Sequence, residues 1–170
     1  MKKGLVEIYT GNGKGKTTAA LGLALRASGA GLKVYIVQFI KGKPYSEIKS
    51  LKKIKNIKIE QCGRGCFIKK PCNKDFECAQ NGLISAEKNI MSKKYDLVIL
   101  DEINVALKLG LVKTVDIINI IKNRPRSVEL VLTGRYCPRS LFKYADLLTE
   151  MKEIKHPYQK GIKARLGVEI

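Results

Sequence analysis

The stretch that decides the fold of this 170-residue chain is Gly11-Asn12-Gly13-Lys14-Gly15-Lys16-Thr17-Thr18. It follows residues 5–9, which favour a strand, and it leads into residues 16–28, whose alanines and leucines favour a helix. Glycines between a strand and a helix let the backbone turn its N–H groups onto phosphate oxygens, and the helix N-terminus adds a favourable dipole. The stretch therefore predicts a P-loop that binds a nucleoside triphosphate, ATP in the first place.

Two residue types in this loop carry specific chemistry. Lys16 supplies a compact positive charge for the phosphates, and Thr17 stands where the hydroxyl of a P-loop coordinates Mg²⁺. The usual motif, G-x-x-x-x-G-K-[ST], has a glycine at the position of Thr10, so the chain departs from it at one place. A glycine-rich turn without a ligand is the alternative interpretation, but the flanking strand and helix patterns favour the P-loop.

A second candidate element is the apolar run at residues 96–100, which leads into Asp101 and Glu102. Carboxylates at the C-terminal end of a buried strand reach the Mg²⁺ shell in P-loop proteins, so both are candidate metal groups. Arg135 follows another apolar strand pattern, residues 128–133, and could neutralise triphosphate charge at the same edge. An ordinary acidic turn and a surface arginine are the alternatives.

Strand and helix patterns alternate along the whole chain. Strand patterns lie at residues 5–9, 33–39, 57–61, 96–100, 128–133 and 147–151, and helical patterns at residues 16–28, 46–53, 75–91, 112–122 and 141–145. This alternation predicts a mainly parallel sheet flanked by helices, a three-layer α/β fold of the P-loop NTPase, RecA-like type. No linker or repeat divides the chain, so residues 1–170 are expected to form a single domain.

Composition narrows the class of protein. The chain is 45% hydrophobic, enough to form a core without disulfide or metal cross-links. No apolar run approaches the roughly 20 residues that span a bilayer. Five cysteines and no export signal favour reduced thiols and a cytoplasmic protein. The formal net charge is +18, but the lysines are dispersed. This favours a solvated surface over a nucleic-acid site, and recruitment of an anionic substrate or an acidic protein partner is the alternative.

Two further features have open interpretations. Four cysteines could hold zinc, but paired C-x₂-C spacings are absent, so inert thiols are favoured; these are Cys62, Cys66, Cys72 and Cys78. His156, the single histidine, is either a substrate contact or a hydrogen-bonded structural residue.

The order of motifs resembles the ATP:corrinoid adenosyltransferases that act on cob(I)yrinic acid a,c-diamide and cob(I)alamin. The resemblance runs nearly end to end and rests on residues 11–20, 24–27, 37–42, 100–102, 124–125, 132–135, 145–146, 150–151, 155–158 and 167–169. It implies that Co(I) of a reduced corrinoid attacks C5′ of the ATP ribose and that inorganic triphosphate leaves, in adenosylcobalamin biosynthesis or salvage. Lys16, Mg²⁺ and Arg135 would then stabilise the charge that grows on the triphosphate.

The resemblance also implies roles for individual residues. The P-loop would hold the nucleotide in the reverse sense to ordinary NTPases, with Thr17 and Glu102 serving Mg²⁺. Arg26 and Glu102 would lie near the ribose. Several family members carry G-F-T-W where this chain has Gly65-Cys66-Phe67-Ile68. Phe67 is therefore the candidate contact for the corrinoid, and a phenylalanine in the core is the alternative.

Two other functions fit part of the pattern. A nucleoside kinase of the thymidine-kinase type also combines a P-loop with a strand that ends in acidic residues, but the missing C-x₂-C pairs count against it. A DNA-stimulated ATP-binding module is suggested by the recombinase-like strand pattern and the basic charge. A homodimer and an acidic, flavodoxin-like reductase as electron donor are further expectations, and the sequence leaves open which corrinoid is preferred.

Overall fold

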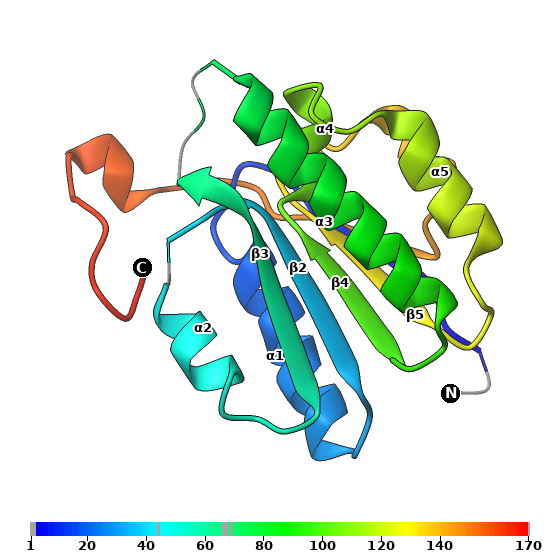
Figure 1. Cartoon of the computed structure of the whole chain (residues 1–170). Coiled ribbons are helices and arrows are strands. Elements are labelled where there is room, and N and C mark those ends of the chain that lie inside the picture. The colour runs from blue at the N-terminus through cyan, green and yellow to red at the C-terminus, as the bar shows by residue number, and fades with distance from the viewer. Residues whose placement is uncertain (1–2, 44, 66–67, 69, 170) are drawn as a thin grey trace.

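The centre of the molecule is a six-stranded sheet in the order β3-β2-β4-β5-β1-β6, in which every neighbouring pair is parallel. The structure is a computed structural model that describes residues 3–43, 45–65, 68 and 70–169 (Figure 1). The strands are β1 (Val6–Thr10), β2 (Val34–Lys41), β3 (Ile57–Gly65), β4 (Leu97–Asp101), β5 (Glu129–Thr133) and β6 (Leu147–Glu150). The predicted α/β fold with a mainly parallel sheet is confirmed.

Helices cover both faces of this sheet and make three layers. The helices are α1 (Lys16–Gly29), α2 (Ser46–Leu51), α3 (Asn73–Met91), α4 (Ile103–Lys108) and α5 (Thr114–Asn123), with short 3₁₀ helices η1 (Arg139–Tyr144) and η2 (Pro157–Lys160). Figure 1 shows α1 and α2 on one face and α3 and α5 on the other. Each face has its own core, one built around the alanines of α1 and the other around α3, α4 and α5.

The central strands are apolar throughout because both of their faces are covered. All five residues of β4 are buried, and in β2 only the last residue is partly exposed. Parallel strands bring their carboxyl ends to one edge, so the residues that end or follow β1, β2, β4 and β5 meet there. This edge holds the P-loop and the predicted acidic residues.

The sequence did not predict α4. Its apolar residues follow β4 after a single intervening residue, and a helix of six residues is too short for a period to stand out. The helix predicted at residues 112–122 begins at Thr114 instead, because Leu111 and Val112 are buried core residues before it. The other predicted helices and strands agree with the structure to within a few residues.

Candidate functional site

The P-loop takes the turn that its glycines allow. Gly11 and Gly15 have positive φ angles of 96° and 118°, which glycine adopts without a steric penalty. A Cβ atom at Gly13 would lie 2.8 Å from the carbonyl oxygens of Met151 and Lys152, so a side chain has no room there. The Gly13 N–H donates to the Met151 carbonyl at 2.7 Å. The loop is therefore packed against the chain that follows β6.

Thr10, the departure from the usual motif, does not disturb this turn. It is the buried last residue of β1, and the left-handed conformation begins only at Gly11. The Thr10 hydroxyl oxygen accepts the Cys137 N–H at 3.3 Å and so connects β1 to the loop after β5. A strand residue in extended conformation has no need of glycine, which explains why threonine is tolerated.

Lys16 is the first residue of α1, and its side chain folds back over its own loop. The Nζ atom donates to the Gly13 carbonyl oxygen at 2.6 Å, and the residue is buried. Burial lowers the pKa of Lys16 below its ordinary value, while the negative charge of Glu102 partly offsets this effect. An anion in the loop would therefore stabilise the ammonium that burial disfavours.

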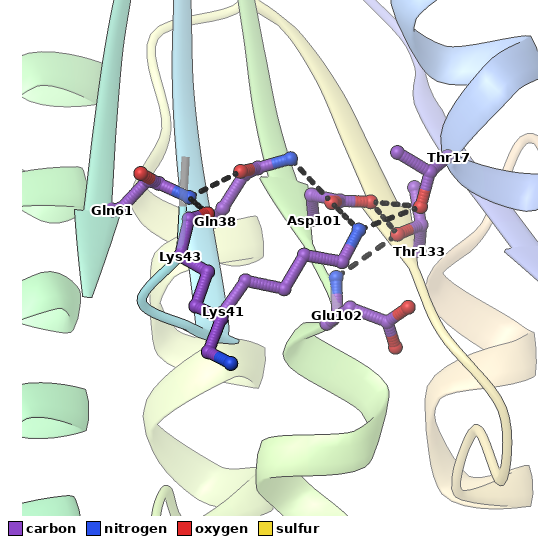
Figure 2. A network of polar contacts seen from close by, with 8 residues as sticks. All are labelled: Thr17, Gln38, Lys41, Lys43, Gln61, Asp101, Glu102 and Thr133. Carbon is purple, nitrogen blue, oxygen red and sulfur yellow. Dashed lines mark hydrogen bonds and ion pairs between the residues drawn. The ribbon is translucent and has the colours of Figure 1, made fainter. Parts of the chain in front are cut away.

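Asp101 is the centre of a hydrogen-bond network at the same edge (Figure 2). The side chain is fully buried. Its Oδ1 atom accepts hydrogen bonds from the hydroxyls of Thr17 at 2.9 Å and Thr133 at 2.7 Å. Its Oδ2 atom accepts one from Gln38 Nε2 at 3.1 Å and forms an ion pair with Lys41 Nζ at 3.0 Å. Four donors from α1, β5 and β2 thus hold one carboxylate in a fixed orientation.

Neighbouring residues extend this network on both sides. Gln61 of β3 donates to Gln38 Oε1 at 3.2 Å and to the Lys43 carbonyl oxygen at 2.9 Å. On the other side, the Glu102 N–H donates to the Thr133 hydroxyl at 3.0 Å. Glu102 itself is in the left-handed region with φ 59°, a conformation that a non-glycine residue adopts at an energetic cost. The backbone after β4 is therefore held in an unusual turn at the site.

Glu102 is surrounded by charges. Burial raises the pKa of Glu102, and the adjacent negative charge of Asp101 raises it further. The positive charges of Lys41, Lys16 and Arg135 act in the opposite direction. Two carboxylates and three cations therefore share this edge of the sheet.

The residues at this edge fit Mg²⁺. The hydroxyl of Thr17 and the carboxylates of Asp101 and Glu102 are oxygen donors, which Mg²⁺ prefers, and it commonly combines one or two carboxylates with nucleotide phosphates. The Lys41 ammonium lies 3.3 Å from Thr17 Oγ1 and 3.0 Å from Asp101 Oδ2, so the site already accommodates a positive charge between these two groups.

Not every predicted residue lies in this network. Arg135 is exposed, and its positive charge acts on Lys16 and Glu102. Arg26 is exposed on α1, ten residues after Lys16, which places it about 15 Å farther along the helix axis. Its charge acts on Tyr9. Arg26 therefore takes no part in the Asp101 network, and its predicted place near the ribose stays a prediction.

The remaining loop residues face solvent. Asn12, Lys14 and Thr18 are exposed, and Lys14 Nζ forms an ion pair with Glu169 at 2.8 Å near the C-terminus. Phe67, the predicted corrinoid contact, lies outside the described residues.

The described cysteines and His156 take no part in the Asp101 network. Among the described residues, no three His, Cys, Asp or Glu side chains come together to hold a metal ion, so Cys62, Cys72 and Cys78 form no such group by themselves. Cys66 lies outside the described residues. His156 is the N-cap residue of η2, and its Nδ1 atom accepts the Tyr158 N–H at 3.2 Å. In the described part of the chain, no helix is long and apolar enough to cross a membrane.

Three of the four residues that bond to Asp101 had no role predicted from the sequence: Gln38, Lys41 and Thr133. All three lie in segments that carry the family resemblance, residues 37–42 and 132–135. Their position at the carboxyl ends of β2 and β5 was the available signal, but it required the strand order.

Comparison with known proteins agrees with the site. The family model of the ATP:corrinoid adenosyltransferases BtuR/CobO/CobP matches residues 2–170. A corrinoid adenosyltransferase of Escherichia coli K12 is 31% identical over 170 residues, which cover 99% of this chain and 86% of the relative. Another from a Sinorhizobium species is 35% identical over 173 residues, covering 99% and 81%. One from Pseudomonas aeruginosa is 33% identical over 171 residues, covering 99% and 84%. With this match along its length and a P-loop beside the Asp101 network, the chain belongs to the ATP:corrinoid adenosyltransferase family.

Proposed function

We propose that this protein transfers the 5′-deoxyadenosyl group of ATP to the Co(I) centre of a reduced corrinoid and releases inorganic triphosphate. The observation that carries the proposal is the meeting of the P-loop and the Asp101 network at one edge of the sheet, in a chain that belongs to this family. The reaction has its place in the biosynthesis or salvage of adenosylcobalamin.

The chemistry places two demands on the protein. Co(I) of the substrate supplies the electron pair for the new cobalt–carbon bond, and the C5′–O bond electrons leave with the triphosphate. Because cobalt is the nucleophile, no residue has to activate water as a general base. The protein has to hold C5′ in line with cobalt and to stabilise the charge on the leaving triphosphate.

The P-loop side of the site suits the second demand. We infer that Lys16 leaves the Gly13 carbonyl oxygen, to which it donates at 2.6 Å, and donates to triphosphate oxygens instead. The negative charge would offset the burial that lowers the pKa of Lys16. Arg135, whose positive charge acts on Lys16 and Glu102, would add a second positive charge to the same leaving group.

Mg²⁺ would be held by the Thr17 hydroxyl and the carboxylates of Asp101 and Glu102. When bound, the ion would neutralise part of the triphosphate charge. The resemblance further supports Arg26 and Glu102 as residues near the ribose, and Phe67 as a residue on the corrinoid side. For this role the ribose would extend from the P-loop along α1 toward Arg26, which lies ten residues after Lys16 on that helix.

Partners of the enzyme follow from its charge and family. The formal net charge of +18 supports an acidic, flavodoxin-like reductase that delivers the electron to cobalt. Turnover in a reconstituted reductase assay would then fall as ionic strength rises. A homodimer in the cytoplasm is part of the same proposal, and the mass by light scattering tests the dimer.

The direct test is formation of a cobalt–carbon bond. Purified protein is mixed with ATP, Mg²⁺ and chemically reduced corrinoid, and the absorption spectrum is followed before and after illumination. We expect a light-sensitive product with wild type and with Lys88→Ala, an exposed change on α3, and little product with Lys16→Ala. Phosphorylated nucleoside with ADP would favour the kinase instead, and DNA-stimulated hydrolysis of ATP would favour the DNA-dependent module. Family membership disfavours both.

A further inference from the structure

Lys41 reaches the site although regular strand geometry would direct its side chain elsewhere. Side chains alternate between the two faces of a strand, so Gln38 and Lys41, three residues apart, should lie on opposite faces. Both nevertheless reach the same atom, Asp101 Oδ2, at 3.1 Å and 3.0 Å (Figure 2). Some irregularity in β2 must therefore redirect Lys41.

The irregularity is at Ile40. Ile40 has a positive φ angle of 68°, and the pairing between β2 and β3 shifts register between Phe39 and Lys41. A β-branched residue in this left-handed region is a conformational outlier. Between the pairs Phe39–Cys62 and Lys41–Gly65, β3 has two residues opposite the single Ile40, so the extra residue of this bulge is in β3. Bulges near active sites commonly re-aim a side chain. The strained conformation at Ile40 thus brings the Lys41 ammonium to Asp101.

The surroundings of this ammonium are those of a held cation. Its Nζ atom lies 3.0 Å from Asp101 Oδ2, 3.3 Å from Thr17 Oγ1 and 5.7 Å from the centre of the Tyr45 ring. The side chain is only 16% exposed. Its ion-pair partner, Asp101, is fully buried, so the two opposite charges stabilise each other at this position. Lys41 is therefore a charged group between two of the groups proposed to hold the metal.

We propose that the Lys41 ammonium is a built-in substitute for the metal ion, which neutralises Asp101 in the nucleotide-free enzyme and is displaced when Mg²⁺ enters with ATP. The inference rests on the proposed metal role of Thr17 and Asp101. A free divalent ion has to expel Lys41 without help. An ion that arrives with ATP brings phosphate oxygens, which complete its coordination shell. The same phosphate oxygens attract the Lys41 ammonium that the ion displaces. Lys41 thereby couples metal entry to nucleotide binding.

Metal binding without nucleotide tests the inference. Mn²⁺ is titrated into nucleotide-free wild type, Lys41→Met and Lys41→Arg, and bound ion is measured by electron paramagnetic resonance. Lys43→Met is the matched control, because it removes an equal charge only two residues from Lys41. The Lys43 side chain is exposed, and the residue joins the network only through its backbone carbonyl, which the substitution keeps. We expect Lys41→Met to bind Mn²⁺ at least about tenfold more tightly than wild type, because a neighbouring positive charge is gone. Lys41→Arg and Lys43→Met should stay close to wild type.

An unchanged Mn²⁺ affinity in Lys41→Met would overturn the inference, and so would an equal rise in Lys41→Met and Lys43→Met, since that would be an effect of net charge alone.

Thermal unfolding supplies a second readout that needs no turnover. Lys41→Met leaves the buried Asp101 charge without its ion-pair partner, so the melting temperature should fall in metal-free buffer. Millimolar Mg²⁺ should recover most of that loss in Lys41→Met and shift wild type little. A loss that Mg²⁺ does not recover would mean that Lys41 is only a structural partner of Asp101.

These results separate the inference from the proposed function. If wild type forms no cobalt–carbon product but Lys41→Met gains metal affinity, the adenosyl-transfer proposal fails and the metal inference stands. If wild type turns over and Lys41→Met gains nothing, only the inference fails.

Discussion

The sheet carries two pairs of acidic residues whose surroundings differ. Asp101 and Glu102 follow one another at the carboxyl edge, where hydroxyls, an amide and the Lys41 ammonium surround them. Glu7 and Glu129 lie on the neighbouring strands β1 and β5, where burial and then the hydrogen bond and charge of Glu7 raise the pKa of Glu129. A pair of carboxylates beside a buried ammonium has the charges that bind metal and phosphate, whereas Glu129, beside a second carboxylate, binds a proton more readily.

The largest effect expected from this comparison concerns activity at the carboxyl edge. Lys16→Ala should lower the rate of adenosyl transfer by roughly 10²–10³-fold, the usual cost of removing one pre-positioned group that stabilises developing negative charge. The measurement is kcat/KM from the cobalt–carbon product, with Lys88→Ala as the control. A rate within threefold of wild type would remove Lys16 from the proposed role.

The next effect concerns the stability of the same edge. Asp101→Asn should lower the free energy of unfolding by about 3 kcal/mol, because Lys41 remains buried without its opposite charge. Urea unfolding measures the change, and circular dichroism verifies that the variant is folded. Double substitution of Asp101→Asn with Lys41→Met should recover part of the loss. A single variant as stable as wild type would show that the ion pair contributes nothing.

At the second acidic pair, removing a charge should have the opposite sign. Glu129→Gln should stabilise the protein by about 0.5–1 kcal/mol at pH 7, since it removes the repulsion between Glu129 and Glu7, its diagonal neighbour on β1. The Leu5 N–H, 2.7 Å from Glu129 Oε2, can still donate to the amide oxygen.

The pH dependence of this gain follows from the pKa shift. The folded-state pKa of Glu129 is raised above its ordinary value near 4.5. Protonation of Glu129 therefore favours the folded state, and that contribution is complete below about pH 4.5 and is lost as pH rises through the folded pKa. The advantage of Glu129→Gln should thus grow with pH through this window and vanish in acid. Urea unfolding at several pH values measures it, and a gain that is constant with pH would contradict the charge argument.

The smallest effect is expected for a half-buried carboxylate near the C-terminus whose two cationic partners are exposed. Glu169 accepts from Lys14 at 2.8 Å and from Arg165 Nη2 at 2.9 Å, and these partners lower its pKa. Solvent screens such exposed pairs, so Glu169→Gln should shift the melting temperature by no more than about 2 °C. Differential scanning fluorimetry suffices here. A shift above about 5 °C would show that the contact between the C-terminal segment and the P-loop is structural.

Most of the fold could be predicted because its signals are local. The P-loop glycines stand between a clear strand and a clear helix, and the apolar run before Asp101 is long enough to identify a buried strand. The resemblance to the ATP:corrinoid adenosyltransferases also rests on residues 11–20 and 100–102. α4 was not predicted, because its apolar residues follow closely after the apolar run of β4 and show no separate helical periodicity.

The rest of the site depends on features that the sequence does not display. Lys41 meets Asp101 only because Ile40 adopts a left-handed conformation, and nothing about an isoleucine predicts a positive φ angle. Glu7 and Glu129 meet only because β5 pairs with β1, although the two residues are far apart in the chain. Strand order and a local bulge, which are tertiary properties, therefore placed the partners that no motif named.

The central claim is that the P-loop holds a leaving group, and the phosphorus product tests it most directly. Phosphorus NMR of a reaction with ATP, Mg²⁺ and reduced corrinoid should show intact triphosphate accumulating in proportion to the adenosylated corrinoid. ADP or orthophosphate as the first product, with no triphosphate, would mean that the bond broken lies at phosphorus and would contradict the account.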